Sequence, residues 1–269
     1  MPAGSFQRDA TATNISHQSA FRMSQHEITR AQFAAIMGTD PSNTTDSSGT
    51  SDPVQMVNWY QAIAFCNKLS LLEGLQPAYS VKIGGTTEVD WANLSFASIP
   101  TTSNADWNAA TCTWTATGYR LPTEMQWMWA AMGATADRSN GYTGTGVNTT
   151  GYTKGYAGST EVAGAQVNMR NYAWYSSNSG SKTHPVGTKT ANELGIYDLS
   201  GNVWEWCWDW YATYPAGEST DYQNSTLATH RVVRGGSWVS LASNCPVAIR
   251  HNYIPYGQSI GIGFRVVRP

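Results

Sequence analysis

Acidic residues alternate with tryptophans in one segment of the chain. Residues 202–210 read NVWEWCWDW, with the four tryptophans on one parity and Glu205, Cys207 and Asp209 on the other. Period-two alternation predicts a strand that carries its indole rings on one face. We expect that face to be a packed aromatic wall, and a cation-binding aromatic cage is the alternative.

The opposite face and the turn before it offer oxygen atoms. Asp198 and Glu205 lie on either side of a turn that contains glycine. Carboxylates and backbone carbonyls are the hard donors that calcium prefers. A calcium site is therefore one interpretation, and pairing of these acids with arginine side chains is the other.

The cysteines and histidines do not form a recognisable catalytic or metal-binding pattern. The four cysteines are far apart, without a C-x-x-C pair or a histidine at ligand spacing, so a zinc site is not expected. Buried free thiols are the expected state for most of them, with disulfides as the alternative. No G-x-S-x-G, H-E-x-x-H or P-loop motif is present, and the five histidines are scattered.

The window from Gly235 to Gly263 has an unusual composition. It contains one formally charged residue, Arg250, one histidine, His251, and many Ser, Asn, Tyr, Ile and Gly residues. Rigid rings combined with short polar side chains are typical of binding loops. The window is therefore a candidate ligand-binding surface, and a loop that closes the core is the alternative.

Overall composition limits the classes of partner. The chain has 269 residues, with 16 Lys and Arg against 18 Asp and Glu, which argues against a nucleic-acid binder. No apolar run approaches the ~18 residues that a membrane span needs. Only 13% of the residues are charged, against a usual ~25%, while Trp and Tyr number 12 and 14. With so few charged residues, we expect the surface to be covered mainly by Ser, Thr, Asn and Gly. A surface of that kind favours a protein outside the cytosol.

Three segments carry helix-start signals in the form of capping boxes. Thr29 with Gln32, Asn58 with Gln61, and Thr123 with Gln126 each open a predicted helix. Helices are thus few, and no linker divides the chain into independent cores. We expect an α+β fold in a single domain spanning residues 1–269, with low regular secondary structure and long loops.

Several motifs in order resemble those of one superfamily. In this sequence they are HEIT at 26–29, GYRLPTE at 118–124, NELGIYDLSGNVWEW at 192–206, RGGSW at 234–238 and GFR at 263–265. Together they resemble the formylglycine-generating enzyme, or sulfatase-modifying factor, family over nearly the whole chain. The resemblance implies a variant of the C-type lectin fold.

The family's enzymes use two cysteines five residues apart after the G-G-S motif, together with copper. Here the second position is Cys245, but the first is Ser240. A serine hydroxyl is a poor ligand for a soft metal and is not ionised near neutral pH. We therefore expect no formylglycine-generating activity and no copper or other redox cofactor. The resemblance does imply a structural calcium, held by side chains of Asp198 and Glu205 and backbone carbonyls of Gly201 and Val203.

A narrower resemblance is to the treponemal variable lipoproteins with this fold, which retroelements diversify at adenines of a template. It implies a variable ligand-binding region at 234–265. There the framework would comprise RGGSW at 234–238, Ala242, Asn244, Cys245, Val247, Ala248, Arg250 and GFR at 263–265. The candidate variable positions are Val239, Ser240, Leu241, Ser243, Ile249, His251, Tyr253, Ile254, Tyr256, Gly257, Ser259 and Ile260. Every residue type at these positions can be reached from an AAC codon by changing adenines alone.

The resulting prediction is a non-catalytic, receptor-like protein that binds an exposed ligand, most simply another protein. Tyr253, Tyr256 and Trp238 would be aromatic anchors, although a place in the framework is the favoured alternative for Trp238. His251, Ser240 and Ser243 would supply polar contacts. A metal-dependent oxygenase of the same superfamily and a calcium-dependent lectin are the alternatives. By resemblance we expect a monomeric bacterial lipoprotein, at the cell surface or secreted, whose leader is absent from this chain.

Overall fold

The central element of the structure is a four-stranded sheet in the order β12–β11–β9–β13. The computed structural model describes residues 1–134 and 146–269. β11 pairs antiparallel with both β9 and β12, whereas β13 runs parallel to β9, so β12 lies at one edge. The members are β9 (Trp204–Trp210), β11 (Arg231–Arg234), β12 (Arg250–Tyr253) and β13 (Ile262–Gly263).

The remaining described strands are short. A second four-stranded sheet has the order β10–β2–β1–β8, and three further pairs are β3 with β14, β4 with β7 and β5 with β6. Their bounds are β1 (Gly4–Gln7), β2 (Ile15–Gln18), β3 (Arg22–Met23), β4 (Tyr79–Ser80), β5 (Lys82–Ile83), β6 (Thr87–Glu88), β7 (Thr111–Cys112), β8 (Val147–Asn148), β10 (Ser219–Thr220) and β14 (Val267–Arg268).

The three predicted helices are confirmed, each with a complete capping box. The side chains of Thr29, Asn58 and Thr123 each accept a hydrogen bond from the backbone amide of a glutamine three residues later. The side-chain oxygen of that glutamine in turn accepts from the backbone N–H of the cap residue. The helices are α1 (Arg30–Met37), α2 (Trp59–Leu72), α3 (Ala105–Asn108) and α4 (Glu124–Ala131), with 3-10 turns η1 (Phe96–Ser98), η2 (Gly151–Thr153), η3 (Met169–Asn171) and η4 (Ala242–Asn244). The short α3 was not predicted.

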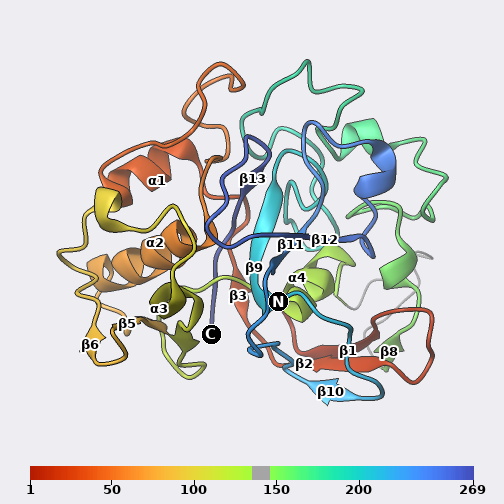
Figure 1. Cartoon of the computed structure of the whole chain (residues 1–269). Helices are drawn as coiled ribbons and strands as arrows, with labels where there is room; N and C mark the ends of the chain where they lie inside the picture. Colours follow the sequence, from red (N-terminus) through yellow and green to blue (C-terminus); the bar gives the residue numbers. More distant parts are fainter. Residues whose placement is uncertain (135–145) are drawn as a thin grey trace.

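The central sheet separates two hydrophobic cores. Trp206, Trp208 and Val233 belong to the core that includes α1 and α2, whereas Cys207 and Val232 belong to the core around α4. Figure 1 shows α2 on one side of these strands and α4 on the other. The predicted alternation of β9 is therefore confirmed, because its two parities face different cores. The expected α+β single domain with few helices and long loops is also confirmed.

The tryptophan face is a packed wall, and a cation of the protein itself lies on it. Trp206, Trp208 and Trp210 are at most 2% exposed. The Arg231 guanidinium carbon lies 3.6 Å from the ring centre of Trp210 and 3.7 Å from that of Trp59. The quadrupoles of these rings therefore stabilise a buried cation that belongs to β11.

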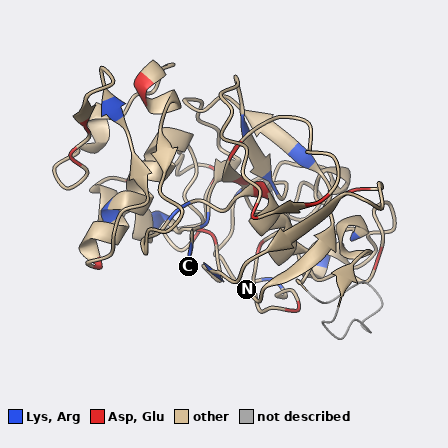
Figure 2. Ribbon diagram, turned by 90° about the horizontal axis from the view of Figure 1, so that it is seen from below, with Lys and Arg blue, Asp and Glu red and all other residues tan. Residues whose placement is uncertain are grey.

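Charged side chains are sparse, and several are internal. Figure 2 shows few charged segments on the periphery and both signs at the central strands. Arg234 and Arg265 are fully buried, as is Glu205. Buried charges require partners. Arg265 pairs with Glu205 of β9, and Arg234 of β11 donates to the Val247 carbonyl, so these residues connect the central sheet to neighbouring segments.

Candidate functional site

The candidate variable positions lie on the surface at and around the edge strand β12. Eleven of the twelve are accessible, four of them exposed and seven half-buried. The exposed ones are Val239, Leu241, Ser243 and His251, and the half-buried ones are Ile249, Tyr253, Ile254, Tyr256, Gly257, Ser259 and Ile260.

Ser240 is the exception, because it is only 6% exposed. Its Oγ accepts a hydrogen bond from the Ser237 backbone N–H at 3.0 Å and lies 3.1 Å from the Ser237 Oγ. The side chain thus closes a turn within the framework. In this structure the Ser240 hydroxyl is therefore engaged within the framework, and a contact from Ser240 to a ligand stays a prediction.

The proposed framework positions are mostly buried. RGGSW at 234–238, GFR at 263–265, Cys245 and Val247 are all inaccessible, whereas Ala242 and Arg250 are half-buried and Asn244 and Ala248 are exposed. A framework assigned from the sequence alone therefore coincides largely with the protein interior.

Two framework arginines hold the backbone of the segment that leads into β12. Arg234 donates to the carbonyl oxygen of Val247 at 3.1 Å and also to that of Ile249. Arg250 makes a bidentate pair with Glu124, at 2.6 and 2.7 Å, at the start of α4. Charge-assisted bidentate pairs have defined geometry, so the main chain here is positioned by side chains outside the variable set.

The loop after β12 is held in the same way. The Trp238 indole donates to the Ile260 carbonyl at 2.9 Å, as a framework side chain would. The backbone amides of Met56 and Trp59 donate to the carbonyls of Ser259 and Pro255 at 3.0 and 2.8 Å. These hydrogen bonds fix the loop through its backbone carbonyls and use no variable side chain.

The two glycines of the RGGSW motif allow the chain to turn close to the buried thiol. Gly235 and Gly236 have φ of 101° and 82°, which side-chain-bearing residues rarely adopt. A Cβ on Gly236 would lie 2.6 Å from the Cys245 Sγ. Burial raises the pKa of the Cys245 thiol to about 12, so it is not a thiolate at neutral pH.

The four candidate calcium ligands lie around the turn before β9. Asp198, which adopts φ 58°, accepts a bond from the Gly187 amide at 2.8 Å through Oδ2. Its Oδ1 is buried without a hydrogen-bond partner, and burial raises the pKa of this carboxyl to about 6. An orphaned buried oxygen is compatible with a cation, so Asp198 fits the proposed ion.

Glu205 does not fit that role in this structure. Its two oxygens accept bonds from Arg265, both at 2.7 Å, and Oε2 also accepts the Trp127 indole N–H at 2.8 Å. Pairing with arginine, the alternative that the sequence left open, is thus correct for Glu205. Within residues 1–134 and 146–269, no group of three or more His, Cys, Asp or Glu side chains is placed to hold a metal ion.

Two buried acids have roles that the sequence did not reveal. Glu27 accepts bonds from the Val203 amide and the Asn202 side chain, at 3.0 and 2.9 Å, and so supports the turn that holds Gly201. Burial and the nearby acidic groups raise the pKa of Glu27 well above its ordinary range. The second acid is Glu124, which pairs with Arg250. In the sequence, the only sign that Glu27 and Glu124 have such roles is that each lies in one of the motifs noted above.

Comparison with known proteins agrees with this geometry. The model of the sulfatase-modifying factor enzyme 1-like domain matches residues 1–269. The chain belongs to this family. The variable protein 1 of Treponema denticola has a similar structure, with a TM-score of 0.84 and 38% identity, over 100% of this chain and 92% of that one. The predicted resemblance is therefore confirmed.

Two curated relatives extend the comparison. The chaperone protein LppX of Paenibacillus barcinonensis is 34% identical over 93% of this chain and 80% of its own. The formylglycine-generating enzyme of Streptomyces coelicolor is 33% identical over 60% of this chain, and the match spans half of that enzyme. Among the described residues, no helix is long and apolar enough to cross a membrane.

The packing around Gly236 generates a testable prediction. Gly217 has a similar φ of 73°, but a Cβ there would meet nothing within 4 Å, so Gly217→Ala reports backbone strain alone. We expect Gly217→Ala to lower the free energy of unfolding by about 1 kcal/mol and Gly236→Ala by about 3 kcal/mol, because the latter also crowds Cys245. Urea unfolding measures both, and equal losses would contradict the close approach.

Proposed function

We propose that this protein is a non-catalytic ligand-binding protein whose region 234–265 displays exchangeable side chains on a fixed scaffold. The observation that carries the proposal is the separation of accessible variable positions from a mostly buried framework. The eleven accessible variable positions are separate from the buried groups that hold their backbone. Substituting such a side chain leaves the anchoring hydrogen bonds of Arg234 and Trp238 in place.

A preorganised surface of this kind favours binding. A backbone already held in place loses little conformational entropy when a ligand binds. Tyr253 and Tyr256 are half-buried, pack against the core and keep part of each ring accessible, as aromatic anchors do. His251 is exposed beside Trp204, with ring centres 5.4 Å apart. We propose a protein as the ligand, because these groups stand along a sheet edge.

A displayed library tests this function. Simultaneous randomisation of the eleven accessible positions should yield mostly folded variants, from which binders to a chosen folded protein such as lysozyme can be selected. A control library varies eleven exposed positions within residues 83–108. We expect enrichment of binders from the first library only, measured by binding to immobilised lysozyme. Loss of folding in most members of the first library, or equal enrichment from both, would refute the proposal.

The alternative function is that of an oxygenase of the same family. It is supported by the sequence identity with the formylglycine-generating enzyme of Streptomyces coelicolor. Against it stand the hydroxyl of Ser240, engaged with Ser237, and the protonated thiol of Cys245. We expect no conversion of a cysteine-containing peptide to the aldehyde in the presence of copper or iron and oxygen. Mass spectrometry of the peptide measures this against a protein-free control. Turnover that disappears in Cys245→Ser would establish the enzyme instead.

We further propose that a structural calcium ion binds at Asp198 Oδ1 with the carbonyl oxygens of Gly201 and Val203. The unpartnered Oδ1 supports this site. After EDTA treatment, calcium at about 100 times its Kd should add about 2.7 kcal/mol, or roughly 5–10 °C in Tm. Asp198→Ala, which removes the side-chain oxygen altogether, should lose this response. An unchanged Tm in the parent protein would mean that the Glu205–Arg265 pair organises the turn without metal.

We assign the protein to the cell surface or the extracellular space, as a monomeric lipoprotein. The sparse charge and the Ser, Thr, Asn and Gly content support that assignment, together with the resemblance to treponemal variable lipoproteins.

A further inference from the structure

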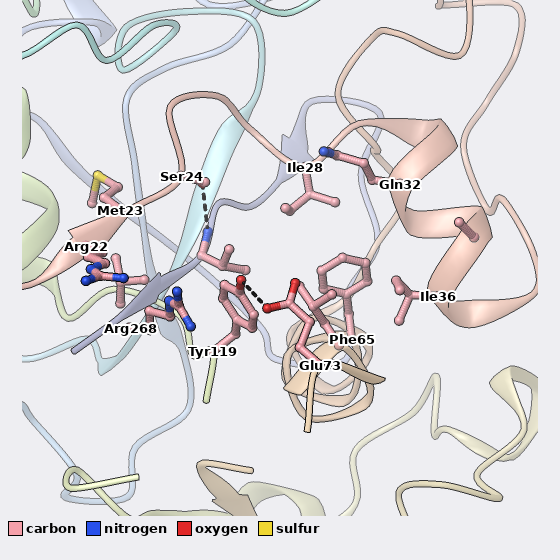
Figure 3. A pocket seen from close by; sticks show the side chains of 14 residues that line it. Arg22, Met23, Ser24, Ile28, Gln32, Ile36, Phe65, Glu73, Tyr119 and Arg268 are labelled. Atoms are coloured by element: carbon pink, nitrogen blue, oxygen red, sulfur yellow. Dashed lines mark hydrogen bonds between the residues drawn. The ribbon is translucent and has the colours of Figure 1, made fainter. Parts of the chain in front are cut away.

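A concave site lies between the β3–β14 pair and helices α1 and α2. This pocket has a volume of about 460 Å³, within the range of small-molecule sites. Its wall is largely apolar, formed by Ile28, Ile36, Phe65, Leu69 and Val266. Figure 3 shows Phe65 and Ile36 toward one end of the pocket and Arg22 and Arg268 toward the other.

The two arginines form a like-charge pair. Arg22 and Arg268 lie directly opposite each other in the antiparallel β3–β14 ladder, so their side chains leave the same face. Neither forms a salt bridge with the residues that the structure describes. The pocket's own acid, Glu73, accepts instead from the Tyr119 hydroxyl at 2.9 Å. The Arg268 guanidinium carbon lies 5.4 Å from the ring centre of Tyr119. Two guanidinium groups on one face of the ladder repel each other, and an anion placed between them would relieve the repulsion.

The apolar wall continues beyond the pocket. Ala35 and Ile36 also line a neighbouring depression of about 370 Å³, together with Leu71 and Leu72. These leucines are 41% and 73% exposed, among the most accessible large apolar side chains that the structure describes. Lys68 lines the same depression, and its ammonium group donates to backbone carbonyls that include Leu94. An acyl chain that left the first pocket past Ile36 would therefore meet the two leucines and the aliphatic stem of Lys68.

We propose that this groove binds a single-chain anionic amphiphile, an acyl chain with a terminal carboxylate. The carboxylate would accept hydrogen bonds from Arg22 and Arg268, since guanidinium groups match its planar geometry. The hydrocarbon chain would lie along Phe65, Leu69 and Ile36 toward Leu72. Burial of its methylene groups supplies the affinity, at about 0.8 kcal/mol each.

Titration calorimetry with dodecanoate, below its micelle concentration, tests the site on the whole protein. Dodecanoate should bind saturably at one site and at least tenfold more tightly than dodecanol or dodecyltrimethylammonium. Replacement of both arginines by glutamine (R22Q/R268Q) should remove that preference without changing dodecanol binding. The variant R170Q/K182Q removes the same charge from exposed positions elsewhere and should bind dodecanoate as the parent does.

A variant that blocks the groove tests where the hydrocarbon chain of the ligand lies. Ala35 is exposed and lines both depressions, so Ala35→Trp should abolish binding of dodecanoate and dodecanol alike. Ala31→Trp, one turn earlier on α1 and outside the lining, is the matched control. Absence of saturable dodecanoate binding, equal binding of the cationic analogue, or full binding by R22Q/R268Q would overturn the proposal. Circular dichroism establishes that each variant is folded.

Discussion

Buried pairing of arginine with carboxylate is the interaction on which the organisation of this molecule depends. Glu205 and Arg265 are both fully inaccessible, and Glu124 contacts Arg250 and Arg234 at the start of α4. Removing one partner of such a pair typically costs about 3–5 kcal/mol, because the other charge remains buried and uncompensated. The pairs therefore fix the central sheet against α4 and against the segment that ends the chain.

This constraint explains how surface variation can coexist with a defined fold. The groups that hold the backbone of residues 247–260 are the Arg234 guanidinium, the Trp238 indole and main-chain amides before and at the start of α2. None belongs to the accessible variable set. Side chains on the edge strand β12 can consequently change identity while their Cα positions remain fixed, which is the property that a diversified binding surface requires.

Local chemistry could be predicted from the sequence, whereas long-range pairing could not. Capping boxes and the alternation at 204–210 are local patterns, and each gave the observed helix starts or strand. Glu205, by contrast, finds its partner 60 residues away in Arg265, so spacing alone left both calcium and arginine open as interpretations. The burial of Ser240 depends on its turn with Ser237, and the Arg22–Arg268 pair depends on strand register across almost the whole chain.

The coding DNA and its surroundings test the central claim most directly. A scaffold that is diversified at its surface should be accompanied by a reverse transcriptase gene and a nearly identical repeat. That repeat should differ at adenines only in codons of accessible positions between 239 and 260, and should match at Arg234, Arg250 and Arg265. Absence of any such repeat, or differences spread over the buried framework codons, would contradict the account.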